Sequence, residues 1–136
     1  MEYETPIGVL LVEDDPDDAE QARHHLMKYP RVKFNITVAP VLKLAFAHME
    51  RKSYDVILLD PGLPDSQGAA TVSRLGICAC NTPMAILTGN AGTRLLEIAA
   101  GREPLFCLEK GPETYEGLAQ RLHEAVRKKQ SQPALH

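Results

Sequence analysis

Hydrophobic and polar positions along the chain alternate between two kinds of pattern. Apolar runs with little polar interruption predict buried strands at residues 7–12, 56–59, 84–87 and 105–108. Residues 34–38 alternate apolar and polar side chains, as expected of a half-exposed edge strand. Between these runs, apolar residues recur at helical spacing, and we expect helices around residues 16–29, 42–49, 72–75, 95–99 and 115–126. This alternation favours an α/β fold, in which one parallel sheet carries helices on both faces.

The start of the first helix has clear sequence signals. Asp15 is suited to the N-cap position and Pro16 to the first helical position, because proline needs no backbone N–H partner there. Asp17 and Asp18 follow and complement the positive end of the helix dipole. The first strand is therefore expected to end in an acidic turn that leads directly into a helix.

Composition and charge narrow the class of protein. A chain of 136 residues predicts one domain, which we place at residues 6–127, followed by a polar tail at 128–136. The net charge of −3 argues against a direct nucleic-acid partner, and no apolar run approaches the length of a membrane span. The N-terminus lacks the pattern of a signal peptide, and three cysteines do not make a disulfide framework. We therefore expect a cytoplasmic protein.

Polar residues follow four of the predicted strands at the point where each strand ends. Glu13 and Asp14 follow the first strand, Asp60 the third, Thr88 ends the fourth and Lys110 follows the fifth. Because ligands bind at the carboxyl ends of parallel strands, we expect these side chains to meet at one edge of the sheet. Clustered carboxylates favour a hard cation such as Mg²⁺. With a lysine and a hydroxyl nearby, such a site can bind a phosphoryl group, and one carboxylate can be the nucleophile that receives it.

Each of these residues also has a purely structural interpretation. An acidic residue after a strand often caps a helix or a turn, as Asp14 and Asp60 would do. A threonine that ends a strand and a solvated lysine are ordinary features. The functional interpretation depends on their joint placement at the ends of four strands, which folding alone does not require.

The same segments carry a family resemblance over about residues 6–127. The motifs are Val-Leu-Leu-Val-Glu-Asp-Asp at 9–15, Ile-Leu-Leu-Asp-Pro-Gly-Leu-Pro-Asp-Ser-Gln-Gly at 57–68, Leu-Thr-Gly at 87–89 and Leu-Glu-Lys at 108–110. In this order the chain resembles the receiver domain of bacterial two-component response regulators. The resemblance implies a flavodoxin-like, doubly wound sheet of five parallel strands in the order 2-1-3-4-5.

The resemblance also implies a function and a role for each site residue. A receiver takes a phosphoryl group from a sensor histidine kinase or a phosphotransfer protein, changes a protein-interaction surface, and loses the group by hydrolysis. It is not an enzyme in any other sense. The implied roles are phosphoacceptor for Asp60, Mg²⁺ ligands for Glu13, Asp14, Asp60 and the Gly62 carbonyl, and phosphoryl-binding partners for Thr88 and Lys110. The downstream protein is not implied, and a homodimer is left open.

The chain departs from the family pattern at two positions near the lysine. Cys107 stands where the family usually has tyrosine or phenylalanine, and Gly111 follows Lys110 in place of proline. These departures keep open a degenerate receiver that acts as a phosphorylation-independent binding module. A phosphohydrolase with Asp60 as covalent nucleophile is the weaker alternative, because the second aspartate that such enzymes need is replaced by Gly62.

Two sets of side chains are assigned to structure rather than to chemistry. Cys78 and Cys80 are expected to be buried thiols near the end of a helix, because no second pair completes a metal site. His24, His25, His48 and His123 lie on helical segments with polar neighbours, and we expect all four to be solvated.

Overall fold

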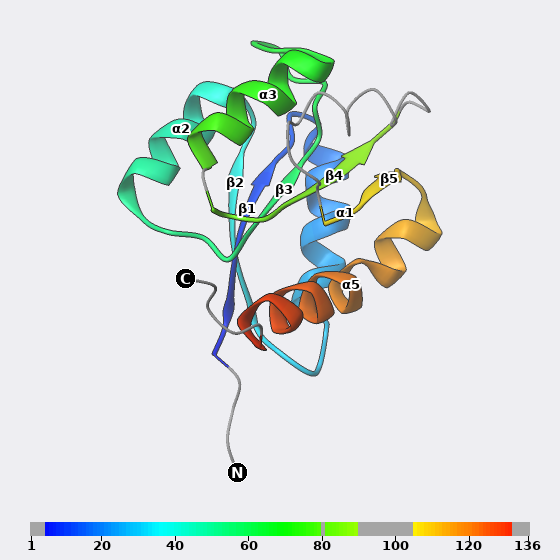
Figure 1. Cartoon of the computed structure of the whole chain (residues 1–136). Helices are drawn as coiled ribbons and strands as arrows, with labels where there is room; N and C mark the ends of the chain where they lie inside the picture. Colours follow the sequence, from blue (N-terminus) through cyan, green and yellow to red (C-terminus); the bar gives the residue numbers. More distant parts are fainter. Residues whose placement is uncertain (1–4, 80, 90–104, 132–136) are drawn as a thin grey trace.

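The computed structural model describes residues 5–79, 81–89 and 105–131 of the chain. Strands and helices alternate along the first two thirds of these residues, as the hydrophobic pattern predicts (Figure 1). The elements are β1 (Ile7–Val12), α1 (Pro16–Met27), β2 (Phe34–Ala39), α2 (Leu42–Arg51), β3 (Val56–Leu59), α3 (Gly68–Ala79), β4 (Met84–Thr88), β5 (Cys107–Glu109) and α5 (Pro112–Ser131).

The strands form one parallel sheet in the order β2-β1-β3-β4-β5. β1 lies between β2 and β3, so that Leu10 pairs with Thr37 on β2 and with Ile57 on β3. β3 and β4 are buried along their whole length, as their uninterrupted apolar sequences predict. β2 lies at the edge, and it exposes Asn35 and Val38 while Phe34 and Ala39 are buried. The predicted fold class and strand order are therefore confirmed.

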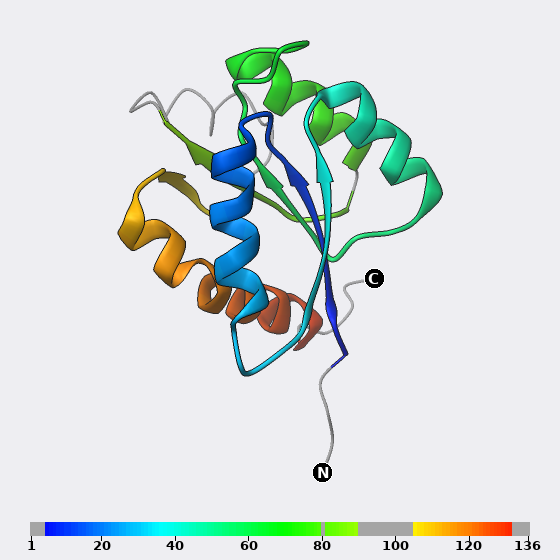
Figure 2. The ribbon, with the colours of Figure 1, turned by 180° about the vertical axis from the view of Figure 1, so that it is seen from behind.

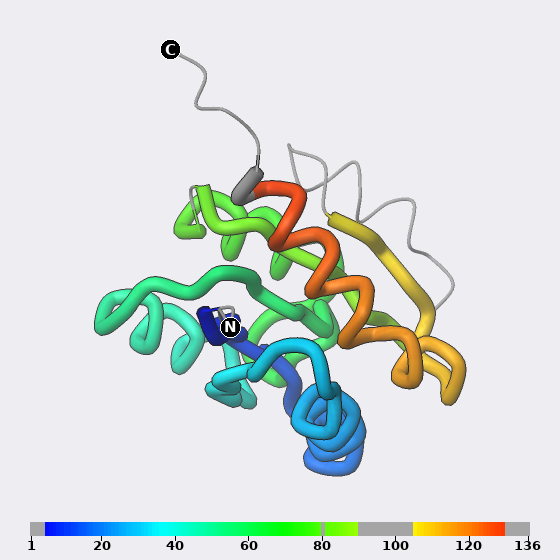
Figure 3. The backbone as a smooth tube through the Cα atoms, turned by 90° about the horizontal axis from the view of Figure 1, so that it is seen from below, coloured from blue at the N-terminus to red at the C-terminus, as the bar shows by residue number. Residues whose placement is uncertain are grey.

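The helices cover both faces of the sheet. α1 and α5 pack on one face, and α2 and α3 pack on the other (Figures 2 and 3). Alternate residues of β1 point to opposite faces, so that Val9 packs against α1 and α5 whereas Leu10 packs against α2 and α3. None of the described helices combines the length and hydropathy that a membrane span requires.

The ends of several elements can be compared with the sequence pattern. α1 begins as predicted: Pro16 is its first residue, and the carboxylate of Asp15 accepts hydrogen bonds from the next two N–H groups of the helix. β5 begins at Cys107, two residues later than predicted, although Leu105 still donates its N–H to the Met84 carbonyl at 2.8 Å. α5 continues to Ser131. The helix predicted around residues 95–99 lies outside the described residues.

Two side-chain predictions are wrong. Cys78 is exposed, because α3 packs through Val72, Leu75 and Ala79, and Cys78 falls outside that stripe; Cys80 lies outside the described residues. His123 is only 2% exposed, because it belongs to the face of α5 that packs on the sheet and α1. The hydroxyl group of Tyr29 lies 2.9 Å from the Nδ1 atom of His123.

The start of α2 is capped from another part of the chain. Val41 occupies the N-cap position and makes no side-chain capping bond. Instead, the carboxylate of Asp65 accepts hydrogen bonds from the N–H groups of Leu42, at 2.9 Å, and Lys43, at 3.1 Å. These backbone hydrogen bonds, that from Leu42 foremost, lower the pKa of Asp65. The loop that follows β3 is thereby attached to the first turn of α2.

This contact predicts the effect of removing the carboxylate. We expect Asp65→Ala to lower the free energy of unfolding at pH 7 by about 1 kcal/mol, the usual effect of losing an N-cap. Because the pKa of Asp65 is lower in the folded than in the unfolded protein, its stabilisation is full above the unfolded value and disappears as pH falls through the folded value. Urea unfolding of wild type and variant at pH 7 and pH 3 measures both effects. An equal loss at the two pH values would contradict the capping role.

Candidate functional site

The carboxyl ends of four strands bring the predicted site residues to one edge of the sheet. Glu13 and Asp14 follow β1, Asp60 follows β3, Thr88 ends β4 and Lys110 follows β5. Backbone hydrogen bonds continue past the strand ends and fix these positions. The N–H of Asp60 donates to the Val12 carbonyl at 2.9 Å, and that of Lys110 donates to the Thr88 carbonyl at 2.8 Å.

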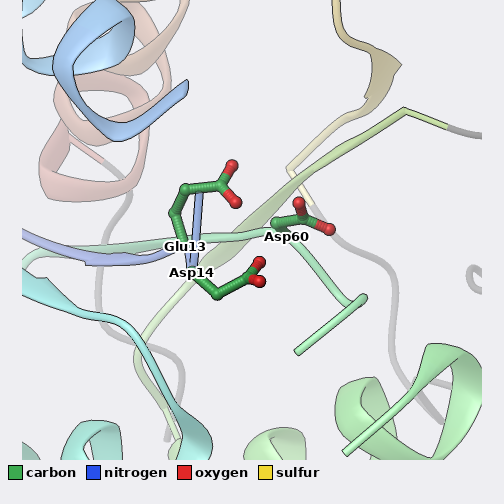
Figure 4. Close-up of side chains that lie close together, drawn as sticks. All are labelled: Glu13, Asp14 and Asp60. Atoms are coloured by element: carbon green, nitrogen blue, oxygen red, sulfur yellow. The ribbon is translucent and has the colours of Figure 1, made fainter. Parts of the chain in front are cut away.

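Three carboxylates lie together at this edge. Glu13, Asp14 and Asp60 each offer one oxygen atom, and the three oxygens lie within 4.8 Å of one another. Figure 4 shows the three side chains converging from the end of β1 and the end of β3. Glu13 is buried, Asp60 is half-buried and Asp14 is exposed, so the cluster is closed on one side and open to solvent on the other. Hard divalent cations such as Mg²⁺ bind sets of oxygen ligands of this kind.

The ammonium group of Lys110 lies against this cluster. Its Nζ atom is 2.6 Å from Oε1 of Glu13 and 2.6 Å from Oδ2 of Asp60. A third carboxylate, that of Asp18 on α1, lies 2.7 Å away. Burial by itself lowers the pKa of Lys110, but the hydrogen bonds to the three carboxylates outweigh burial and raise it. Lys110 is therefore charged at neutral pH.

Glu13 is the carboxylate whose ionisation the surroundings change most clearly. Burial raises its pKa, the hydrogen bond from Lys110 opposes that rise, and the nearby carboxylate of Asp60 adds to it. The resulting pKa is about 7, compared with an ordinary value of 4.5. Near neutral pH Glu13 is therefore partly protonated, and a bound cation would displace that proton.

The loop after β3 holds Asp60 in place. Oδ1 of Asp60 accepts a hydrogen bond from the N–H of Gly62 at 2.9 Å, which leaves Oδ2 to Lys110. The carbonyl of Pro61 accepts hydrogen bonds from the N–H of Gly68 at 3.0 Å and from the buried hydroxyl of Thr71 at 2.8 Å. Gly68 has a φ of +56°, a conformation that residues with a side chain rarely adopt. The turn sequence after Asp60 is therefore closed on itself and presents the carboxylate in one orientation.

The structure brings the site residues predicted from the sequence to the same edge of the sheet. Glu13 and Asp60 each lie 2.6 Å from Lys110, and an oxygen of Asp14 lies within 4.8 Å of theirs. Gly62 lies beside Asp60, and Thr88 is buried at the end of the adjacent strand. The contact between Asp18 and Lys110 was not predicted, because Asp18 was assigned to the helix dipole alone. Its position in the first turn of the helix that directly follows Glu13 and Asp14 is the signal in the sequence that points to this edge of the sheet.

Comparison with known proteins agrees with this fold and site. The model of the response regulator receiver domain matches residues 9–127. The chain is 29% identical over 122 residues to the cell cycle transcriptional regulator CtrA of Caulobacter vibrioides, which covers 88% of this chain and 50% of CtrA. It is 34% identical over 82 residues to transcription factor SKN7 of Candida albicans, which covers 60% of this chain and 14% of SKN7. The chain thus spans half or less of the length of these relatives.

Solved structures show the same fold. The receiver domain of the Francisella response regulator 1452 superposes with a TM-score of 0.75 at 24% identity, over 90% of this chain and 98% of that one. The signal receiver domain of a modulated diguanylate cyclase from Desulfovibrio desulfuricans G20 gives a TM-score of 0.75 at 25% identity, over 93% and 98%.

The parallel sheet, with acidic residues and a lysine at the carboxyl ends of its strands, defines a phospho-accepting signalling domain. The chain belongs to the response regulator receiver domain family of two-component systems. A phosphorylation-independent binding module and a phosphohydrolase are not favoured by this assignment. Receiver domains in general are signalling domains that receive phosphoryl groups from histidine kinases or phosphotransfer proteins, and they bind Mg²⁺ at an acidic pocket.

Proposed function

We propose that Asp60 is the residue that accepts the phosphoryl group, and that Lys110 and Thr88 bind the group once it is attached. One observation carries this assignment: the ammonium group of Lys110 lies 2.6 Å from Oδ2 of Asp60, within a cluster of three carboxylates. A lysine in this position offsets the negative charge that a phosphoryl group brings. Thr88, at the end of the next strand, is the hydroxyl donor for the same group.

The donor set fits Mg²⁺. The three carboxylate oxygens, of Glu13, Asp14 and Asp60, lie within 4.8 Å of one another, and one side of the cluster is open to water. Mg²⁺ prefers a few carboxylate ligands and retains several water molecules. The carbonyl of Gly62 is the fourth proposed protein ligand. When bound, the ion offsets charge on the phosphoryl oxygens during transfer.

The residues of this chain position the acceptor for an in-line transfer. A carboxylate oxygen of Asp60 attacks the phosphorus of a phosphohistidine, the new O–P bond forms, and the P–N bond breaks as the imidazole leaves and takes up a proton. The N–H of Gly62 and the ammonium of Lys110 each hold one oxygen of the acceptor before the reaction. Water later hydrolyses the acyl phosphate and returns the carboxylate of Asp60.

The proposed partners follow from this reaction. The donor is a sensor histidine kinase or a phosphotransfer protein in the cytoplasm, and the receiving partner is a protein surface or an output domain. The chain acts on no other substrate, so that its chemistry is limited to gaining and losing its own phosphoryl group. Nucleic acid is not a direct partner, in keeping with the net charge of −3.

Intact-mass spectrometry after incubation with acetyl phosphate tests the assignment of Asp60. We expect one phosphoryl adduct that requires Mg²⁺ in the wild type, and no adduct in Asp60→Asn, because the amide has the shape of the carboxylate but is not a nucleophile. Circular dichroism of the variant checks that the fold is retained.

Asp17→Asn is the matched control for this experiment. Asp17 is an exposed aspartate in the first turn of α1, and its replacement changes the net charge equally. We expect the control to form the adduct at the rate of the wild type. An adduct on Asp60→Asn, or an equal loss in the control, would refute the assignment.

A further inference from the structure

The hydrogen-bond donors of Lys110 are all in use. An ammonium group has three N–H donors. In this structure the Nζ atom of Lys110 lies within hydrogen-bonding distance of three carboxylates, at 2.6 Å from Glu13, 2.7 Å from Asp18 and 2.6 Å from Asp60. A phosphoryl group on Asp60 brings three further acceptor oxygens and about −1.5 to −2 units of charge. Any hydrogen bond that Lys110 makes to that group must therefore replace one of the existing three.

The bond to Asp18 is the one that can be given up most easily. The side chain of Asp18 is 34% exposed, whereas those of Asp60 and Glu13 are 13% and 5% exposed. A carboxylate released into water recovers its hydration, but one released inside the cluster does not. Asp18 also borders a groove of about 350 Å³ between α1 and the start of α5, which gives water access to its carboxylate.

We propose that Asp18 is a positioning residue that holds Lys110 in the unphosphorylated protein and competes with the phosphoryl group for it. This inference rests on the proposed function of Asp60. The contact between Asp18 and Lys110 stabilises only the state without a phosphoryl group, so it lowers the affinity of the site for that group. Asp18 thereby makes phosphorylation of the receiver less favourable. The contact between α1 and Lys110 then differs between the unphosphorylated and the phosphorylated protein.

Binding of beryllofluoride, a noncovalent analogue of the phosphoryl group, measures this competition at saturating Mg²⁺. We expect Asp18→Asn to bind beryllofluoride about three- to tenfold more tightly than the wild type, the range for losing a partly exposed charge-assisted contact. Asp17→Asn removes the same charge from the adjacent position of the same helix turn, but within the described part of the chain Asp17 forms no ion pair with Lys110. We expect its affinity to stay within twofold of the wild type.

Two further variants separate competition for Lys110 from a change in helix structure. Asp18→Glu keeps the charge and can reach Lys110, so we expect it to restore the affinity of the wild type. In a Lys110→Ala background, with folding confirmed by circular dichroism, the additional change Asp18→Asn should no longer alter the affinity.

The outcomes distinguish this inference from the function on which it rests. Unchanged or weaker binding by Asp18→Asn, or equal tightening by Asp17→Asn, would overturn the competition while leaving Asp60 as the acceptor. Retention of the Asp18→Asn effect in the Lys110→Ala background would overturn it as well. Failure of the wild type to bind beryllofluoride with Mg²⁺ would contradict the proposed function, and the inference with it.

Discussion

A Lys110→Ala variant is expected to lose about 3–5 kcal/mol of its free energy of unfolding at pH 8 without Mg²⁺, the usual result of leaving buried charges without their partner. The Lys110 side chain is 14% exposed and those of Glu13 and Asp60 are 5% and 13% exposed, so that solvent replaces little of the lost interaction. The remaining carboxylates repel one another at short range. Urea unfolding in the presence of a chelator measures the loss.

Two comparisons show whether the loss comes from the carboxylate cluster. Lys33→Ala removes an exposed lysine just before β2 and is expected to change the free energy of unfolding by less than about 0.5 kcal/mol. Added Mg²⁺ should recover most of the loss in Lys110→Ala, because a divalent cation then supplies the missing positive charge. A variant as stable as Lys33→Ala would show that the cluster does not depend on Lys110. A loss that Mg²⁺ does not reduce would point to packing instead.

The part of the site that could be predicted from sequence is the part that strand ends determine. Where a buried strand stops is visible in the hydrophobic pattern, and parallel pairing places the next residue of each strand at a common edge. Glu13, Asp60 and Lys110 were therefore brought together before any side-chain position was known. The family motifs added Gly62, which no hydrophobic pattern identifies.

The contacts that escaped prediction depend on how helices and loops sit against the sheet. Asp18 reaches Lys110 because α1 begins beside the end of β5, and Asp65 caps α2 because the loop after β3 passes its first turn. Neither distance follows from spacing along the chain. His123 was assigned to solvent from its polar neighbours, but the α5 face on which it lies packs against α1. Local polarity does not reveal such burial.

The stability of the metal-free protein is expected to fall as pH rises from 5 to 8, and Glu13 is the cause. Burial raises the pKa of Glu13 to about 7 in the folded protein, compared with 4.5 in the absence of these surroundings. An acid with a raised folded pKa stabilises the fold fully below its unfolded pKa, and this contribution disappears as pH rises through the folded value. The 2.5-unit difference corresponds to roughly 3 kcal/mol. Urea unfolding with a chelator at intervals across this range measures the slope.

Two experiments test whether Glu13 causes this pH dependence: the first replaces Glu13, and the second adds Mg²⁺. The side chain introduced by Glu13→Gln cannot ionise. We therefore expect the free energy of unfolding of this variant to change by less than about 1 kcal/mol between pH 5 and pH 8. With Mg²⁺ present, the stabilisation of the wild type by the cation should instead increase as pH rises. The cation binds the deprotonated carboxylates, and at higher pH fewer protons compete with it for these groups. Parallel pH slopes in wild type and Glu13→Gln would assign the titration to another group. A Mg²⁺ stabilisation that does not change with pH would show that Glu13 is already ionised at pH 5, and that Lys110 outweighs the burial of its carboxylate.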